Sequence, residues 1–358
     1  MILTKYFLRS LIDWLFRRRS IGLRLTRIGA GLFVVALVGL SVGVTIPTKD
    51  GPFIFSWDSS GGAAVLTWAV FLVATALILI GLVLIARDVR LENRKKVIVI
   101  EARGLRDWAG EPLENAISPA VKGRRDAFTV DVRQRIVDGQ IVSPDRALES
   151  LSGLPDDIAR RLSGVDRSDV TFALGGLAPV PLLFLLGVIV DDEHKTILMD
   201  WDRKSQMWRA LDDEDDGKRF AITGMSEVCK TDSRAVLAVS ASYDVLDADI
   251  RLVEPSAPII RLDLADRSTE SHWSEKKQQA LGQQFLDTIM GLARDGISEV
   301  SLFLAAPASL SIRLGTLYDK RNLPKLLVNQ YENADPVKFP WAVVMPVAGR
   351  CRPELLQR

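Results

Sequence analysis

Two long apolar stretches near the start of the chain are its clearest pattern. Residues 28–46 and 63–86 contain no charged side chain. A transmembrane helix needs about 20 such residues, so each stretch is long enough to cross a bilayer. A buried core helix is the alternative, but core helices seldom run this far without a charge. The pattern predicts a helical hairpin with spans at 28–46 and 63–86.

Basic side chains flank this predicted hairpin. A run of three arginines stands at 17–19, two more basic residues follow at 95–96, and the connecting segment 47–62 has only Lys49. Cytoplasmic flanks are rich in Lys and Arg. We therefore expect a multi-pass membrane protein with both termini in the cytoplasm. A cleaved signal peptide fits poorly, because the basic region before the first stretch is too long.

The membrane part is then expected to have five segments. Residues 1–27 form a basic amphipathic cytoplasmic segment, which either lies on the inner leaflet or acts as a plain anchor. The first span at 28–46, an outward-facing loop at 47–62, the second span at 63–86 and a basic linker at 87–96 follow. Gly39 and Gly43 form a G-x-x-x-G pattern, which permits close helix approach in lipid but also arises by chance in glycine-rich spans.

After residue 96 the pattern changes to short apolar runs typical of buried strands, separated by longer helix-like segments. The runs are 97–100, 170–174, 197–199, 235–239, 259–262 and 300–304, and the clearest helix-like segments are 274–293 and 306–317. Strands that alternate with helices predict an α/β fold with a mainly parallel sheet.

Two halves of this region follow one plan. Each opens with a strand and has a later strand that ends in small residues and runs into an apolar helix, at 173–179 and at 303–309. We interpret this as an internal duplication with halves at 97–225 and 226–358, and a boundary near Gly224.

Charge divides the chain in the same way. The net charge of +1 combines +8 over residues 1–96 with −7 over the rest. The first part suits an anionic membrane surface, and the second is not typical of a protein that binds long nucleic acid. The two cysteines, Cys229 and Cys351, exclude a disulfide framework.

The strand-to-helix junctions are the best candidates for binding. Ligands of open α/β sheets sit at the carboxyl ends of strands, and free N–H groups at a helix start suit phosphate. Gly175 and Gly176 mark the first junction, and Ala306, Pro307 and Ser309 mark the second. Small residues that merely permit tight packing are the alternative at each junction.

Residues after the opening strand of each half complete the candidate site. In the first half, Arg103 and Gly104 can meet a phosphate and Trp108 can stack on a base. Surface arginine and core tryptophan are the alternative. In the second half, the residues after the opening strand supply hydroxyl groups and an aromatic ring. They are Ser240, Ser242 and Tyr243.

Signatures of catalysis or metal binding are weak. The sequence has no G-x-G-x-x-G, Walker A, H-E-x-x-H or C-x-x-C pattern. Trp201 and Trp208 are interpreted as packing residues, and the acidic run 212–216 as a solvated loop. We expect neither catalytic residues, nor a metal, nor a cofactor.

The region after residue 96 resembles the SAVED domain, the cyclic-oligonucleotide sensor of CBASS anti-phage systems. The similar segments are 301–310 (SLFLAAPASL) with 326–332 (LLVNQYE), and 172–182 (FALGGLAPVPL) with 199–202 and 207–208. The resemblance implies two fused CARF-like Rossmannoid halves. With the two-span hairpin, the whole chain resembles a transmembrane-SAVED effector.

This resemblance implies a function and partners. A cyclic di- or trinucleotide made by a CD-NTase would bind across the halves, SAVED domains would self-associate, and the clustered hairpins would disrupt the lipid bilayer of the bacterial inner membrane. The loop at 47–62 would then be periplasmic. A membrane-tethered ring nuclease that cleaves its own ligand is an alternative, because such cleavage needs little more than positioning of a 2′-hydroxyl. A receptor that signals to another protein is a third possibility.

Overall fold

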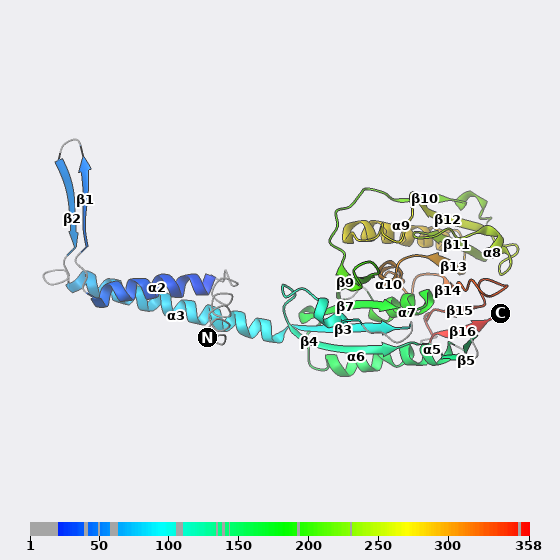
Figure 1. Ribbon diagram of the computed structural model, residues 1–358, viewed down its shortest axis with the longest axis horizontal. Coiled ribbons are helices and arrows are strands. Elements are labelled where there is room, and N and C mark those ends of the chain that lie inside the picture. Colours follow the sequence, from blue (N-terminus) through cyan, green and yellow to red (C-terminus); the bar gives the residue numbers. More distant parts are fainter. Residues whose placement is uncertain are drawn as a thin grey trace. The chain divides into compact units, whose positions relative to one another are not determined.

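The structure is a computed structural model. It describes residues 21–38, 42–48, 51–57, 64–104, 110–133, 135–137, 140–142, 144–191, 194–229, 231–349 and 352–358. The chain divides into two compact units, Met1–Arg94 and Lys95–Arg358 (Figure 1). Residues 1–20, which make up most of the segment expected to lie on the inner leaflet, are outside the described residues.

The first unit is a pair of packed helices joined through a two-stranded hairpin. Its elements are α2 (Ile21–Val38), β1 (Val42–Thr48), β2 (Gly51–Trp57) and α3 (Ala64–Arg94). Strands β1 and β2 are antiparallel. The rings of Phe33 and Phe71 join the two helices, with centroids 4.8 Å apart. Among the described residues, one helix, Thr67–Arg94, is long and apolar enough to cross a membrane.

These bounds differ from the predicted spans. Helix α2 begins before residue 28 and ends at Val38, and residues 42–46 of the predicted span belong to strand β1. Glycine and β-branched residues dominate this segment, and both disfavour helix. Helix α3 continues to Arg94 through most of the predicted linker, because residues 87–94 include neither glycine nor proline.

Gly43 lies in strand β1, which favours the alternative that the Gly39–Gly43 pattern arose by chance. Other glycines bring the helices together. A Cβ atom built at Gly22 would lie 2.8 Å from the Gly81 carbonyl oxygen, and one built at Gly29 would lie 2.8 Å from that of Ala74. Only glycine permits such close backbone approach, so these positions hold α2 against α3.

The second unit opens with a five-stranded sheet in the order β4-β3-β7-β8-β9. Its strands are β3 (Lys96–Arg103), β4 (Arg124–Asp131), β7 (Val170–Leu177), β8 (Lys195–Asp202) and β9 (Met207–Ala210), and the small hairpin β5 (Arg135–Val137) and β6 (Gln140–Val142) stands apart. Helices α4 (Leu113–Ala116), α5 (Asp145–Ser152), α6 (Leu154–Leu162) and α7 (Val180–Val190) and the 3-10 turn η1 (Arg167–Asp169) connect them. Within the five-stranded sheet all pairs are parallel except β8 with β9.

A seven-stranded sheet follows in the order β10-β12-β11-β13-β14-β15-β16. Its strands are β10 (Phe220–Thr223), β11 (Arg234–Ser240), β12 (Ile259–Leu264), β13 (Glu299–Ala305), β14 (Lys325–Gln330), β15 (Trp341–Val344) and β16 (Glu354–Gln357). Helices α8 (Asp247–Arg251), α9 (Glu275–Arg294) and α10 (Ala308–Thr316) and the turn η2 (Met225–Glu227) accompany it.

The strand orders support the predicted duplication. The series β4-β3-β7-β8-β9 and β12-β11-β13-β14-β15 have the same order, and each has three parallel pairs followed by one antiparallel pair. The second sheet begins slightly before the predicted boundary, since β10 starts at Phe220 and pairs with β12.

One hydrophobic core joins the two halves. Helix α7 is apolar all round and nine of its eleven residues are buried, as expected for a helix covered on every side. It crosses α10 where two glycines meet: a Cβ built at Gly187 would lie 2.1 Å from the Ile312 carbonyl oxygen. Trp201 and Trp208 are both buried with ring centroids 5.5 Å apart, which agrees with a packing role.

Candidate functional site

Two reciprocal hydrogen bonds link the halves at the carboxyl ends of their strands. The Ser309 amide, in the first turn of α10, donates to Asp200 Oδ2 near the end of β8 over 2.8 Å. The Val180 amide, at the start of α7, donates to Gln330 Oε1 at the end of β14 over 3.2 Å. Each helix start therefore meets a strand end of the other half, and the carboxyl ends of β7, β8, β13 and β14 share one edge. We call this the carboxyl edge.

Asp200 is a buried charge at this edge, with 4% of its surface exposed. It also accepts a 2.8 Å hydrogen bond from the Trp201 amide, and His272 Nε2 lies 3.3 Å from Oδ2. Burial raises the pKa of Asp200, but the His272 imidazole and the Ser309 amide outweigh it, so the pKa lies below its usual range. The carboxylate is thus ionised in the folded domain at neutral pH.

A chain of buried polar groups continues from Ser309. The Gln278 amide donates to Ser309 Oγ and to the His272 carbonyl, each over 2.8 Å. Arg313 Nε donates to Gln278 Oε1 over 3.3 Å. These bonds hold α9, α10 and the segment before α9 together beneath the edge.

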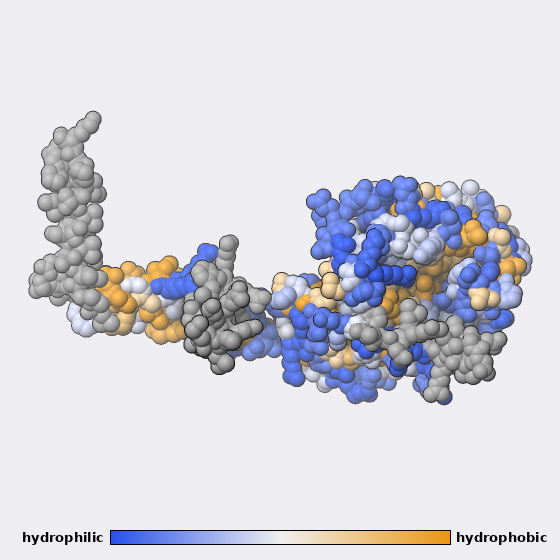
Figure 2. Space-filling model, viewed as in Figure 1, coloured by the Kyte–Doolittle hydropathy of each residue, from blue (hydrophilic) through white to orange (hydrophobic). Residues whose placement is uncertain are grey.

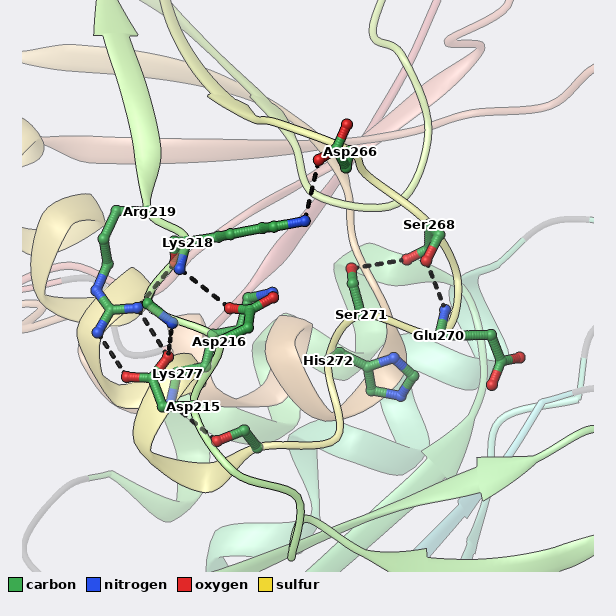
Figure 3. A network of polar contacts seen from close by, with 12 residues as sticks. Asp215, Asp216, Lys218, Arg219, Asp266, Ser268, Glu270, Ser271, His272 and Lys277 are labelled. Atoms are coloured by element: carbon green, nitrogen blue, oxygen red, sulfur yellow. Dashed lines mark hydrogen bonds and ion pairs between the residues drawn. The ribbon is translucent and has the colours of Figure 1, made fainter.

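The acidic run 212–216 is a largely exposed loop, as we expected, and ion pairs anchor part of it. Asp216 binds Lys277, whose side chain is 2% exposed, with 2.8 Å between Nζ and Oδ2. Asp215 accepts from Arg219, and this hydrogen bond is the main cause that lowers the pKa of Asp215 to about 2. Figure 3 shows both pairs, with His272 nearby. Buried Lys277 needs a counter-charge, and this requirement ties the loop down.

The first-half candidates separate into accessible and packed residues. Arg103 ends β3, and its side chain is 31% exposed and bonded to Glu101 over 2.7 Å. The Gly104 amide donates to the Leu177 carbonyl over 2.7 Å. Gly175 and Gly176 are buried inside β7 rather than beyond it.

Side chains fill the space at both β7 glycines. A Cβ at Gly175 would lie 2.9 Å from the Trp208 ring, and one at Gly176 would lie 2.8 Å from Leu183 Cδ2. These contacts favour the packing alternative. Trp108 lies outside the described residues.

The second-half candidates separate in the same way. Ser240 is fully buried and its hydroxyl accepts from the Val245 amide over 3.3 Å, while Ser242 is 8% exposed. Ser309 is fully buried in the network above. Tyr243 is 62% exposed. Ala306 and Pro307, just before α10, are half-buried.

The expectation of free amides at both helix starts needs correction. Gln330 accepts from the first amide of α7, Pro181 has none, and the amides of Leu182 and Leu183 bond to the Pro179 carbonyl. At α10, the Ser309 amide donates to the carboxylate of Asp200. Side chains of the other half therefore accept hydrogen bonds from amides that were expected to bind a phosphate.

Three residues at the edge escaped the sequence reasoning: Asp200, Gln330 and Tyr331. Tyr331 follows β14 directly and is 47% exposed. Its ring contacts Phe339, with centroids 5.4 Å apart. The sequence did contain a signal for Tyr331, because this residue directly follows an apolar run typical of a buried strand. In the described part of the chain, no group of three or more His, Cys, Asp or Glu residues could hold a metal ion.

Two family models match the chain. Residues 1–148 match the SAVED-fused 2TM effector domain, and residues 154–345 match the SMODS-associated sensor domain fused to various effectors, SAVED. The chain thus combines a two-span transmembrane domain with a SAVED sensor domain. A comparison with curated proteins gives no match.

Solved structures similar to the chain include two receptors. One is the Acinetobacter baumannii Cap4 SAVED/CARF-domain containing receptor with the cyclic trinucleotide 2′3′3′-cAAA, at 14% identity and a TM-score of 0.47. The other is the Moraxella osloensis Cap4 receptor, at 14% identity and a TM-score of 0.44. The alignments cover 79% of this chain and 58% and 59% of those chains.

Proposed function

This chain belongs to the family of SAVED sensor domains, here fused to a two-span effector domain, and from that premise we propose that it is a membrane-anchored CBASS effector controlled by a cyclic oligonucleotide. The ligand would bind at the carboxyl edge of the sensor. Its binding would cluster the sensor domains, and the clustered hairpins would disrupt the inner membrane and abort the infection.

The observation that carries this proposal is the pair of reciprocal bonds at the carboxyl edge. Asp200 with Ser309, and Gln330 with Val180, join corresponding places of two duplicated halves. Equivalent strand ends of the two halves therefore lie close together, which supports a site that both halves share. A ligand with repeated units in a ring suits such a site, because each half can contact one nucleotide in a similar way.

The accessible residues of the edge offer suitable chemistry. Tyr243 and Tyr331 expose aromatic rings, and an aromatic ring can stack on a nucleobase. Arg103 supplies a guanidinium group for a phosphate. Ala306 and Pro307 allow a ligand to approach the backbone. We assign ligand contact to Tyr243, Tyr331, Arg103, Ala306 and Pro307. Gly104 packs against Ala178, where a Cβ would lie 2.7 Å away, and we assign a supporting role to it and to Ser240, Ser242, Ser309, Gly175 and Gly176.

The membrane step depends on the two helices of the first unit. We propose that α2 and α3 are the two membrane helices and that both termini lie in the cytoplasm, where the ligand is made. A single pair of helices cannot enclose an aqueous path, and helices in lipid gain little from the hydrophobic effect on association. The sensor domain must then supply the clustering, through a higher affinity of its ligand-bound form for further copies.

A thermal-shift screen of residues 95–358 against cyclic di- and trinucleotides tests the sensor function. A ligand at a hundredfold excess over Kd adds about 2.7 kcal/mol of stability. Dye release from liposomes that carry the full chain, with and without that ligand, tests the effector function. No stabilisation by any cyclic oligonucleotide would contradict the sensor function. Linear products after incubation would favour a ring nuclease.

A further inference from the structure

The face of α3 that points away from α2 carries an apolar stripe that ends in arginines. Gly81 of α3 lies against Gly22 of α2. Successive helix residues are 100° apart, so Val83, Arg87 and Arg90 lie on the opposite side of α3. All three are exposed, and we call this side the outward face of α3.

Two side chains mark the depth of the outward face in a bilayer. Trp68 is 65% exposed near the start of α3, and Arg87 is the first charged residue after the charge-free stretch. At 1.5 Å per residue they are roughly 28 Å apart along the helix, which matches a hydrocarbon thickness of about 30 Å. Because tryptophan favours the membrane–water interface, Trp68 marks one interface and Arg87 the other.

The stretch between these two residues is suited to lipid. Leu72, Leu79 and Val83 of the outward face are exposed by 65%, 58% and 67%. Figure 2 shows the largely hydrophobic surface of the α2–α3 pair, with hydrophilic residues where α3 continues toward Arg94. An acyl chain can therefore follow the outward face up to Arg87.

Arg87 and Arg90 lie at the depth of the lipid phosphates. The polar layer on each side of the hydrocarbon region is roughly 5–7 Å thick, which corresponds to about four residues of helix. Both arginines fall within this layer, and residues three apart are neighbours on a helix surface. Arg94 lies roughly 10 Å beyond Arg87 and is therefore outside the layer.

The charges of α3 are segregated by face. Asp88 and Glu92, the two acidic residues of this helix, lie on the side of α2 and are half-buried. Arg87, Arg90 and Arg94 share the outward face, where α3 has no acidic residue. Like charges at this spacing destabilise a helix. An anionic group would relieve the repulsion, whereas a zwitterionic headgroup would bring a further cation.

A hollow of about 450 Å³ opens at the same place, which is within the range of small-ligand sites. Six described residues line it, all from the outward face of α3: Val83, Ala86, Arg87, Arg90, Leu91 and Arg94. Apolar side chains and guanidinium groups thus meet in one hollow. A phospholipid has the same order of groups, an acyl chain followed by a phosphate.

We propose that Arg87 and Arg90 form a binding site for the headgroup of an anionic phospholipid. A guanidinium group can donate two parallel hydrogen bonds to phosphate oxygens, and the acyl chain follows Leu79 and Val83 along the outward face. Basic pockets beside membrane helices bind anionic headgroups. The site needs α3 in a bilayer but neither a cyclic oligonucleotide nor clustering, so it is independent of the proposed function.

Lipid competition tests the site on the unchanged full chain. The protein is purified in a neutral detergent and mixed with equal amounts of phosphatidylglycerol and phosphatidylcholine, and native mass spectrometry measures the lipids that stay bound. We expect phosphatidylglycerol to be retained severalfold more than phosphatidylcholine. Equal retention would overturn the inference. Displacement by inorganic phosphate at the same concentration would also overturn it, because the site would then bind a free anion.

Matched variants distinguish this site from general electrostatic attraction. Arg87→Gln/Arg90→Gln removes both site residues, whereas Arg24→Gln/Lys95→Gln removes two exposed charges elsewhere in the same basic flanks. We expect severalfold lower retention of phosphatidylglycerol in the first variant and nearly unchanged retention in the second. Equal losses in both variants would overturn the inference. The competition on the unchanged chain does not depend on the folding of either variant.

The outcome is separate from that of the dye-release experiment. Selective retention of phosphatidylglycerol without ligand-dependent dye release would keep the lipid site and contradict the effector function. Dye release without selective retention would keep the effector function and overturn the lipid site.

Discussion

Asp200 and Ser309 are 109 positions apart in the chain, yet the Ser309 amide donates a 2.8 Å hydrogen bond to the Asp200 carboxylate. The bond joins strand β8 of one half to helix α10 of the other. A negative charge at a helix start is stabilising. This relationship turns two duplicated sheets into one domain with a common carboxyl edge.

Loss of the Asp200 carboxylate should destabilise the sensor domain. Asp200→Ala leaves the buried Ser309 amide without its acceptor, which costs about 1–3 kcal/mol. Gln330→Ala removes the corresponding bond at a half-buried position and should cost less. Urea unfolding of residues 95–358 measures both. Equal losses of unfolding free energy in the two variants would contradict the larger contribution that we expect from Asp200.

Acid should remove the contribution of Asp200. Its folded pKa lies below the ordinary value of 3.8. The ionised form therefore stabilises the fold fully above the unfolded pKa, and this stability is lost as pH falls through the lower folded pKa. The unfolding free energy of Asp200→Asn should approach that of the unchanged domain between pH 5 and about 2. A gap that stays constant over this range would count against the assignment.

Two glycine-to-alanine changes should have opposite effects. At Gly315 of α10, a Cβ would lie 2.0 Å from the Phe184 carbonyl oxygen. The helix crossing must then open, at a cost of about 1–3 kcal/mol. At Gly291 of α9, the nearest atom would be Met225 Cε at 3.4 Å, and alanine should stabilise the helix by about 0.5–1 kcal/mol. Thermal unfolding distinguishes the two, and a harmless Gly315→Ala would refute the tight crossing.

Arg103 should matter for both ligand binding and stability. Arg103→Ala removes the partner of Glu101, which is 5% exposed, so the fold is weakened as well. The double variant Glu101→Gln/Arg103→Ala should recover stability while ligand affinity stays low. Calorimetric titration with a cyclic oligonucleotide that stabilises the unchanged domain provides the affinity. Full affinity in the double variant would exclude Arg103 from the site.

The orientation of the hairpin can be tested in cells. The basic flanks predict that tags at Met1 and Arg358 are protected from external protease, whereas a tag near Gly51 is cleaved. A cleaved C-terminal tag in intact cells would place the sensor outside and contradict cytoplasmic sensing.

Local patterns in the sequence were enough for the main architecture. Charge-free stretches indicated membrane helices, and the alternation of apolar runs with helical segments predicted the parallel sheets and their duplication. These features depend on the periodicity and composition of neighbouring residues. The same local rules correctly interpreted Trp201 and Trp208 as packing residues, both of which are buried.

Contacts between distant segments decided the rest. No local pattern shows that Gly22 and Gly29 meet α3, that Gln330 accepts from an amide of α7, or that buried Lys277 pairs with Asp216. Each depends on which surfaces come together when the elements pack. The sequence by itself therefore determined the elements and their repetition. Only the tertiary structure decided which junction residues remain accessible, because burial and hydrogen-bond partners are properties of the packed chain.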